Sequence, residues 1–242
     1  MDGATAPGVV AGRGGEMEPG QLAAMIDHTL LKPSATGAGI DKLCDEAAEY
    51  GFIAVCINPV WVSRCGARLA GTPVKVASVV CFPLGASRTD MKVAESMRAI
   101  DDGASEIDMV AQLGELMAGN TAFVRDDITA VAEAVHAADP AYKLKVILEA
   151  ATLTNEQIAA GCKCAVEAGA DFVKTSTGFH AAGGAKVDHV RLMRQHAGPL
   201  GIKAAGGIRT LASMKSMIEA GATRIGCSAG PKIMNLMSRL AF

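Results

Sequence analysis

The chain has 242 residues, of which 50% are hydrophobic and 20% are charged, so it can bury the core of one sizeable domain. The formal net charge is −2 and no Lys/Arg cluster occurs, which argues against nucleic acid or an anionic membrane as a partner and favours a small molecule. Aromatic residues make up only 4%, which favours parallel strands covered by helices over an all-β sandwich.

The N-terminal segment, residues 1–16, is rich in Gly, Ala and Pro and has no helical periodicity, so we expect a mobile tail before a folded domain over residues 17–242. It lacks a contiguous apolar signal core, and no apolar run of about 18 residues occurs in the chain. The seven cysteines are odd in number and lie mostly in apolar runs, as expected of reduced thiols. These features predict a cytoplasmic protein.

The most informative pattern is a recurring unit in which a helical segment ends at Gly and passes directly into a β-rich run. The four copies lie at 49–58, 101–110, 167–176 and 219–228. In each copy the Gly fits the left-handed position that ends a helix, and the residues after it begin a strand. The unit therefore predicts four helix-to-strand connections.

Four further strand-like runs bring the expected number of strands to about eight. They lie at 26–31, 74–82, 144–150 and 201–206. The segments between the strands place apolar residues at helical spacing. The clearest of these helical segments are 41–50, 88–100, about 120–136, 155–168, 187–195 and 211–220.

This order of elements predicts an α/β fold, a single (β/α)8 TIM barrel with parallel strands and a short extra helix near the N-terminus. A closed barrel is the simplest arrangement for about eight strands that alternate with helices. An open doubly wound sheet is the alternative. It is disfavoured because no GxGxxG motif follows the first strand.

Polar side chains inside apolar strands mark the expected site, because alternate strand residues of a barrel point inward and those near the C-terminal ends face the active site. These polar positions are Asp27, Thr29, Asn58, Asp108, Lys145, Glu149, Lys174, Ser176 and Lys203. Lys174 and Lys203 interrupt strands that helices should cover on the outside, so both are predicted to point inward. The sequence leaves the roles of Asp27, Lys145 and Glu149 open.

An inward lysine beside a second cation suits attack on a carbonyl, because burial and the neighbouring charge lower the pKa of an amine towards neutral pH. The resulting imine withdraws electrons from the adjacent carbon–carbon bond without a metal. Lys174, Lys203 and Asp108 therefore form a set suited to Schiff-base cleavage: a nucleophile, a tuning cation and a carboxylate for proton transfer. The pattern does not distinguish the two lysines, and a buried salt-bridge network that only fixes the barrel is the alternative.

Two Gly-rich turns follow the last two strands, at 204–210 and 226–230, and each runs into a helical segment. Consecutive glycines let backbone N–H groups converge on an anion, and loops after strands seven and eight form the recurrent phosphate site of this fold. Arg209 and Ser228 could add side-chain donors. The turns predict a phosphate site, with tight turns alone as the alternative.

Several motifs together resemble the deoxyribose-phosphate aldolase family of class I aldolases. They are KTSTGF around Lys174, EIDMV around Asp108, GIKAAGGIRT around Lys203, IDHTLL near the start and VCFPLGA at 80–86. The resemblance extends from about residue 20 to the end of the chain. It implies metal-independent, reversible cleavage of 2-deoxy-D-ribose 5-phosphate to D-glyceraldehyde 3-phosphate and acetaldehyde.

The resemblance also implies a role for each site residue. By this resemblance, Lys174 forms the imine, Lys203 tunes it and Asp108 relays protons through water. The residues on the phosphate side are Gly206, Gly207, Arg209 and Ser228, and Thr177 and Gly178 of the TSTG segment join the expected substrate-binding set. Cys56 matches a family cysteine near the active site, for which packing is at least as good an explanation as reactivity.

Two positions depart from the pattern of some family members. Where those members have a phosphate-binding lysine directly after TSTG, this chain has Phe179, so phosphate affinity is expected to rest on backbone N–H groups and Arg209. Where some members end in a tail with a terminal Tyr that assists proton transfer, this chain ends in LMSRLAF, and its tyrosines are Tyr50 and Tyr142. Another group or water is then expected to protonate the enamine carbon.

Two other functions compete with the aldolase. A phosphosugar isomerase or synthase would use Asp108 and Glu149 as acid and base and would form no covalent adduct. A barrel-shaped binding protein would keep the phosphate turns without turnover. No HExxH or paired CxxC occurs, so we expect no cofactor and no metal. We expect a homo-oligomer, with a dimer as the simplest form, because barrel enzymes often associate through their outer helices.

Overall fold

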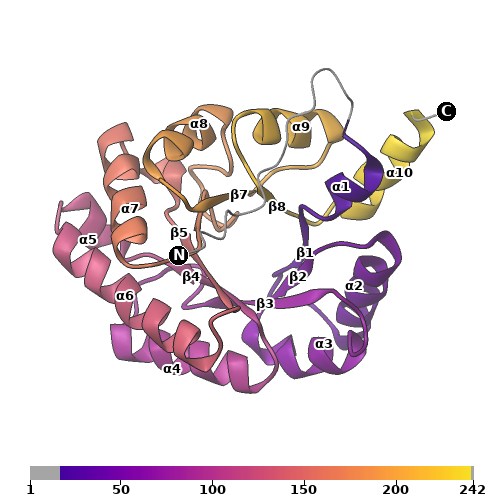
Figure 1. Ribbon diagram of the computed structural model, residues 1–242, viewed down its shortest axis with the longest axis horizontal. Helices are drawn as coiled ribbons and strands as arrows, with labels where there is room; N and C mark the ends of the chain where they lie inside the picture. The colour runs from indigo at the N-terminus through magenta and orange to yellow at the C-terminus, as the bar shows by residue number, and fades with distance from the viewer. Residues whose placement is uncertain (1–16, 241–242) are drawn as a thin grey trace, which may run out of the picture.

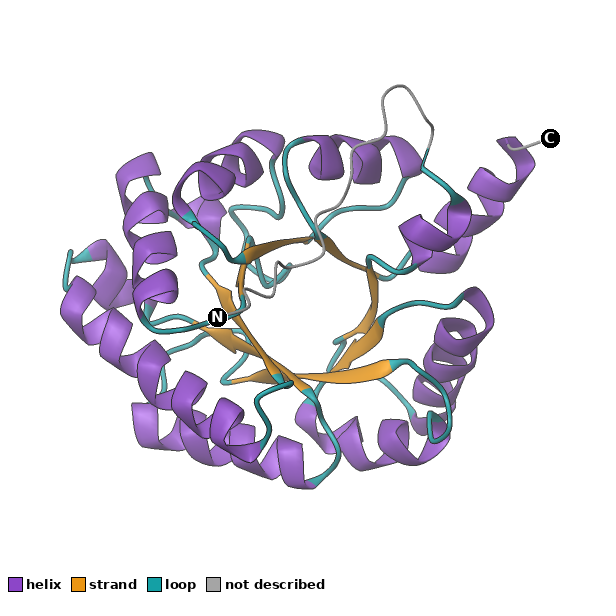
Figure 2. Cartoon of the chain, in the orientation of Figure 1, coloured by secondary structure: helices purple, strands orange, loops and turns teal. Residues whose placement is uncertain are grey.

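The computed structural model describes residues 17–240. The predicted tail, residues 1–16, lies outside the described residues. Within the described part, eight parallel strands close into a ring that helices surround, as the view down the barrel shows (Figure 1, Figure 2). The predicted (β/α)8 barrel is therefore confirmed, and the open-sheet alternative is wrong.

Each strand pairs in parallel with its neighbours in the sequence, and the last strand also pairs with the first, which closes the barrel. The strands are β1 Ile26–Leu30, β2 Ala54–Ile57, β3 Lys75–Val80, β4 Glu106–Val110, β5 Lys143–Ile147, β6 Phe172–Lys174, β7 Gly201–Ala205 and β8 Arg224–Cys227. All eight overlap the β-rich runs expected from the sequence.

Helices connect the strands on the outside of the ring. They are α1 Pro19–Ala23, α2 Gly37–Tyr50, α3 Val62–Arg68, α4 Thr89–Asp101, α5 Leu113–Met117, α6 Thr121–Ala138, α7 Asn155–Glu167, α8 Val187–His196, α9 Leu211–Glu219 and α10 Gly230–Leu240, with 3-10 turns η1 Pro59–Trp61 and η2 Ala150–Thr152. The predicted extra helix is α1, which lies beside α10 (Figure 1). None of these helices combines the length and the apolar character needed to cross a membrane.

The helix ends follow from local chemistry. Thr154 begins α7 with a capping box, because its hydroxyl accepts from Gln157 N while the Gln157 side chain accepts from Thr154 N. After α7, Gly169 has a φ of 75°, a conformation that strongly favours glycine. The other three predicted helix-ending glycines, Gly51, Gly103 and Gly221, also have positive φ. The recurring unit thus ends its helices as predicted.

Strand alternation separates the apolar layer from the polar interior. Ile107, Val173 and Ile202 point outward from their strands and are fully buried against the surrounding helices. Burying an aliphatic side chain of this size contributes roughly 1.5–3 kcal/mol. On each strand, the residues that alternate with these apolar ones point into the barrel. The apolar packing that forms the outer layer therefore places charged side chains at the centre.

Candidate active site

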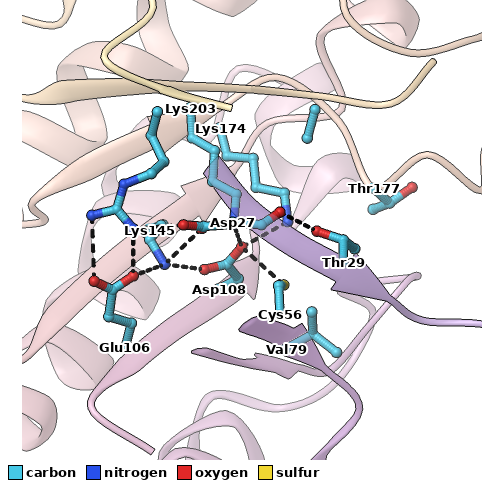
Figure 3. A network of polar contacts seen from close by, with 12 residues as sticks. Asp27, Thr29, Cys56, Val79, Glu106, Asp108, Lys145, Lys174, Thr177 and Lys203 are labelled. Carbon is cyan, nitrogen blue, oxygen red and sulfur yellow. Dashed lines mark hydrogen bonds and ion pairs between the residues drawn. The ribbon is translucent and has the colours of Figure 1, made fainter. Parts of the chain in front are cut away.

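The register of the strands brings the two predicted lysines together. Lys174 on β6 is the direct Cα partner of Lys203 on β7, and Asp108 on β4 is the partner of Lys145 on β5. All four side chains point into the barrel, where they meet from strands that lie far apart in the sequence (Figure 3). Each is at most 2% exposed. The interior of the barrel is thus a buried charged cluster.

Asp108 is the centre of this cluster. Its Oδ2 lies 2.7 Å from Lys174 Nζ and 2.7 Å from Lys203 Nζ, while its Oδ1 lies 2.7 Å from Lys145 Nζ. Three ammonium groups therefore bind one carboxylate. The structure confirms that the predicted inward residues meet, and it adds Lys145, whose role the sequence left open.

A second set of contacts lies around Asp27. Lys203 Nζ also binds Asp27 Oδ2, and Arg224 donates to Asp27 Oδ1 at 2.7 Å. Arg224 also donates to Glu106 at 2.9 Å, and Lys145 Nζ lies 2.6 Å from Glu106 Oε2. Sequence reasoning missed Glu106 and Arg224. The available signal was strand alternation, because Glu106 stands two residues before Asp108 and therefore points to the same side.

The charges of this network do not balance. It contains four cations and only three carboxylates, a formal excess of one positive charge when all groups are ionised; its members are Asp27, Glu106, Asp108, Lys145, Lys174, Lys203 and Arg224. A buried charge without a counter-charge is unfavourable. With one of its lysines neutral, the network has no excess charge.

The electrostatic surroundings lower the pKa of Asp108 and raise the pKa of Lys203. Burial alone would raise the pKa of Asp108, but Lys145, Lys174 and Lys203 hold that pKa well below its ordinary value. Burial alone would lower the pKa of Lys203, but Asp108 and Asp27 outweigh it and raise that pKa above its ordinary value. Lys203 is therefore held as a cation by two carboxylates.

Lys174 occupies a different position from the other two lysines. It contacts one carboxylate, Asp108, whereas Lys203 contacts two and Lys145 contacts three. Its Nζ lies 6.0 Å from the centre of the Phe82 ring. Lys174 and Lys203, but not Lys145, line the pocket at the mouth of the barrel. Of these two pocket-lining lysines, Lys174 has the fewer ionic partners.

Cys56 on β2 packs against the same cluster, with its Sγ 3.8 Å from Asp108 Oδ2. Burial raises the pKa of its thiol. A fully buried, neutral thiol is a poor nucleophile, so the structure favours packing over reactivity for this residue.

A pocket of about 250 Å³ opens above the two lysines at the C-terminal ends of the strands. It is lined by all six predicted substrate-side residues: Thr177, Gly178, Gly206, Gly207, Arg209 and Ser228. Gly206 and Gly207 have φ values of 93° and 83°. A Cβ atom at Gly206 would lie 2.9 Å from Gly184 Cα, so the turn after β7 needs glycine for both conformation and space.

A larger hollow of about 480 Å³ lies between the turn before α9 and helix α10. It shares Arg209 with the smaller pocket but includes no strand-end lysine. The smaller pocket is therefore the one that connects the buried lysines with the glycine turns after β7 and β8. Over residues 17–240, no three His, Cys, Asp or Glu side chains are grouped to hold a metal ion.

The model of the family described as DeoC/LacD family aldolase matches residues 21–235. The chain belongs to this aldolase family. A deoxyribose-phosphate aldolase from Geobacillus sp. (strain WCH70) is 51% identical over 214 residues, which cover 88% of this chain and 94% of the relative. The resemblance found in the sequence is therefore confirmed, and this DeoC/LacD family member is an enzyme, a carbon–carbon lyase.

Solved structures agree with the assignment to this aldolase family. A putative deoxyribose-phosphate aldolase from Coccidioides immitis superposes with a TM-score of 0.86 at 46% identity, covering 92% of this chain and 87% of that one. The deoxyribose phosphate aldolase from Aeropyrum pernix, described as having a unique tetrameric structure, superposes with a TM-score of 0.85 at 31% identity, covering 92% of this chain and 93% of that one.

Proposed function

We propose that this aldolase reversibly cleaves 2-deoxy-D-ribose 5-phosphate to D-glyceraldehyde 3-phosphate and acetaldehyde through an imine on Lys174. The observation that carries the proposal is the shared oxygen: Lys174 and Lys203 both bind Asp108 Oδ2, and both line a pocket that the glycine turns also line. The names of the curated relatives support the substrate.

The first step needs a neutral amine on Lys174. The network carries one excess positive charge, and Lys174 is the lysine held by the fewest carboxylates. Lys203 keeps its proton because Asp108 and Asp27 raise its pKa. The Lys174 Nζ then attacks the aldehyde carbon C1, and loss of water gives the protonated imine.

The imine then acts as an electron sink. Asp108, acting through water, accepts the proton of the substrate 3-hydroxyl, the C2–C3 bond breaks, and its electron pair forms an enamine while D-glyceraldehyde 3-phosphate leaves. The same relay returns that proton to C2, and addition of water to the resulting imine releases acetaldehyde and regenerates the amine. Asp108 lies 2.7 Å from Lys174 Nζ, so in this proposal it accepts and returns the protons of imine formation and hydrolysis.

The phosphate is proposed to lie against the turns after β7 and β8. Gly206 and Gly207 supply backbone N–H groups, while Arg209 and Ser228 supply side-chain donors at the same wall. Phe179 lines the pocket where some family members carry a lysine, and it packs edge-on against Phe82 with ring centres 5.3 Å apart. Phosphate binding therefore rests on backbone donors and Arg209.

Product analysis tests this proposal against an isomerase. The purified enzyme is incubated with 2-deoxy-D-ribose 5-phosphate, and both products are quantified with dehydrogenase-coupled assays. We expect acetaldehyde and D-glyceraldehyde 3-phosphate in equal amounts, and no products with Lys174→Met. Lys163→Met is the matched control because the exposed Lys163 pairs only with Glu167 on the surface of α7. Consumption of substrate without acetaldehyde would contradict the proposal.

We also propose that the enzyme is a homo-oligomer, with a dimer as its smallest form. The 31% identical chain from Aeropyrum pernix is described as tetrameric, which supports association in this family. Light scattering at micromolar concentration should give at least twice the chain mass of 24.8 kDa.

All seven cysteines are free thiols, which suits the proposed cytoplasmic location.

A further inference from the structure

Glu149 is a buried carboxyl group that the proposed mechanism does not use. It follows β5, is 1% exposed and has backbone angles of φ 51° and ψ 49°, a left-handed conformation that is uncommon outside glycine. Within residues 17–240 it has no cationic side chain within salt-bridge distance, and it does not line the substrate pocket. Strained, buried polar residues of this kind persist where surrounding structure requires them, which calls for a specific role.

The partner of Glu149 is Thr177, in the turn that follows the proposed nucleophile. Thr177 N lies 3.3 Å from both carboxylate oxygens, and the Thr177 hydroxyl donates to Oε2. The same hydroxyl accepts from Phe179 N at 3.1 Å. Its only proton is therefore directed to Glu149 and away from the pocket, although Thr177 itself lines that pocket.

The end of β5 holds the whole turn that carries Lys174. Leu148 N donates to the carbonyl of Lys174 at 3.0 Å, and Ala150 N donates to the carbonyl of Thr175 at 2.8 Å. Between Leu148 and Ala150, Glu149 makes the next contact with this turn, through its side chain and to Thr177. The backbone bonds hold Lys174 and Thr175 in place. The Glu149 side chain instead holds the part of the turn beyond them, at Thr177.

That part forms one wall of the proposed phosphate site. Gly178 N is not used in any hydrogen bond described for residues 17–240, and Gly178 stands against Gly206, where an added Cβ would lie 3.6 Å from Gly206 Cα. The turn after β6 and the turn after β7 therefore present their backbones side by side. A shift of Thr177 moves the Gly178 donor relative to Gly206 and Gly207.

We propose that Glu149 is a positioning residue, acting through Thr177, that holds the Gly178 N–H towards the substrate phosphate and so sets the preference for phosphorylated over unphosphorylated sugar. The proposal rests on the proposed function. It assigns Glu149 no part in proton transfer, because its carboxylate is engaged by Thr177 and is absent from the pocket wall.

The test compares cleavage of 2-deoxy-D-ribose 5-phosphate with cleavage of unphosphorylated 2-deoxy-D-ribose by wild type and Glu149→Gln. The amide keeps the size of the side chain but carries no charge and has one acceptor oxygen where the carboxylate has two, so the charge-assisted bonds from Thr177 are weakened. We expect KM for the phosphorylated sugar to rise about tenfold, the effect of one displaced hydrogen bond to a charged group, with kcat changed less than about twofold. The kcat/KM for the unphosphorylated sugar should stay within about twofold.

Two further variants connect the effect to Thr177. Thr177→Val removes the hydroxyl and should raise the same KM, and combining it with Glu149→Gln should add little because both changes break one contact. Thr177→Ser keeps the hydroxyl and should retain the wild-type ratio. If Glu149→Gln does not fold, the Val and Ser pair tests the same contact.

Asp171→Asn is the control for loss of a hydrogen-bonded, partly buried carboxylate elsewhere in the barrel. Asp171 accepts from Leu144 N at 2.8 Å before β6, away from the pocket. We expect this variant to be less stable but to keep the wild-type substrate ratio. Equal losses for both sugars in Glu149→Gln, or no change in either, would overturn the proposal.

Calorimetric titration with inorganic phosphate separates this inference from the proposed function. Wild type should bind phosphate about tenfold more tightly than Glu149→Gln even if neither sugar is cleaved. Absence of cleavage by wild type would refute the proposed reaction, whereas equal phosphate affinity in the two proteins would refute the role of Glu149.

Discussion

Lys174 and Lys203 share a single oxygen atom, because the Nζ atoms of both lie 2.7 Å from Asp108 Oδ2. One carboxylate oxygen cannot neutralise two ammonium groups, so the protonation of either lysine depends on the other. Lys203 has Asp27 as a second partner and Lys174 has none beyond Asp108 in the described network. This asymmetry explains how two lysines of the same type can differ in role.

Replacing Lys203 should disable the enzyme without unfolding it. In Lys203→Met the tuning cation is lost from the oxygen that both lysines contact, so we expect kcat/KM to fall about 10²–10⁴-fold, as for loss of proton-transfer groups. Steady-state kinetics and thermal denaturation would measure both effects, with Lys163→Met on α7 as the control. Near-normal kcat/KM in folded Lys203→Met would show that the cation is dispensable.

The free energy of unfolding should decrease at acidic pH, where Asp27 takes up a proton. Burial alone would raise the pKa of Asp27, but Lys203, Arg224 and Lys145 hold it below its ordinary value. A lowered folded-state pKa contributes stability that is fully present above the unfolded value of about 3.9 and is lost as the pH falls from there through the folded value.

The matched measurement is the free energy of unfolding of wild type and Asp27→Asn between pH 3 and pH 8. Removing one member of a buried ion network should cost about 3–5 kcal/mol at neutral pH. That difference should be constant from about pH 5 to pH 8 and shrink by about 1 kcal/mol at pH 3, because wild type then loses what the variant already lacks. Parallel curves throughout this range would contradict the assignment.

Phe179 offers a gain-of-affinity test of the phosphate site. Its side chain is 49% exposed and lies beside the glycine turns, so a lysine there can reach an anion in the pocket without displacing buried atoms. We expect Phe179→Lys to lower KM for 2-deoxy-D-ribose 5-phosphate several-fold at low ionic strength and less at high salt. Phe179→Met is the uncharged control, and an equal gain in both variants would remove the electrostatic explanation.

The barrel and its central residues could be predicted because their signals are local. Gly51 and Gly169 end helices through their own backbone conformation, and Lys174 stands out because it interrupts an apolar strand. Strand alternation could also have identified Glu106 and Arg224. Charged residues near strand ends are common at protein surfaces, however, so the sequence alone did not distinguish these two from surface residues.

Other features depend on contacts between distant parts of the chain. The second partner of Lys203 is Asp27, which lies 176 positions away, so the asymmetry between the two lysines appears only once the barrel is closed. The contact between Glu149 and Thr177 depends on a left-handed backbone at a glutamate, which no local pattern indicates. The sequence therefore indicated the candidate site and, through the family resemblance, the roles of its lysines, while the contacts that distinguish the two lysines required the fold.

The most direct test of the account is to trap the imine. The enzyme is incubated with acetaldehyde and sodium borohydride, which reduces an imine to a stable secondary amine, and the adduct is located by peptide mass spectrometry. We expect one ethyl group on Lys174 in wild type and none in Lys174→Ala, with Lys203 and Lys145 unmodified. An adduct on Lys203 instead, or no adduct on any strand lysine of folded protein, would contradict Lys174 as the nucleophile.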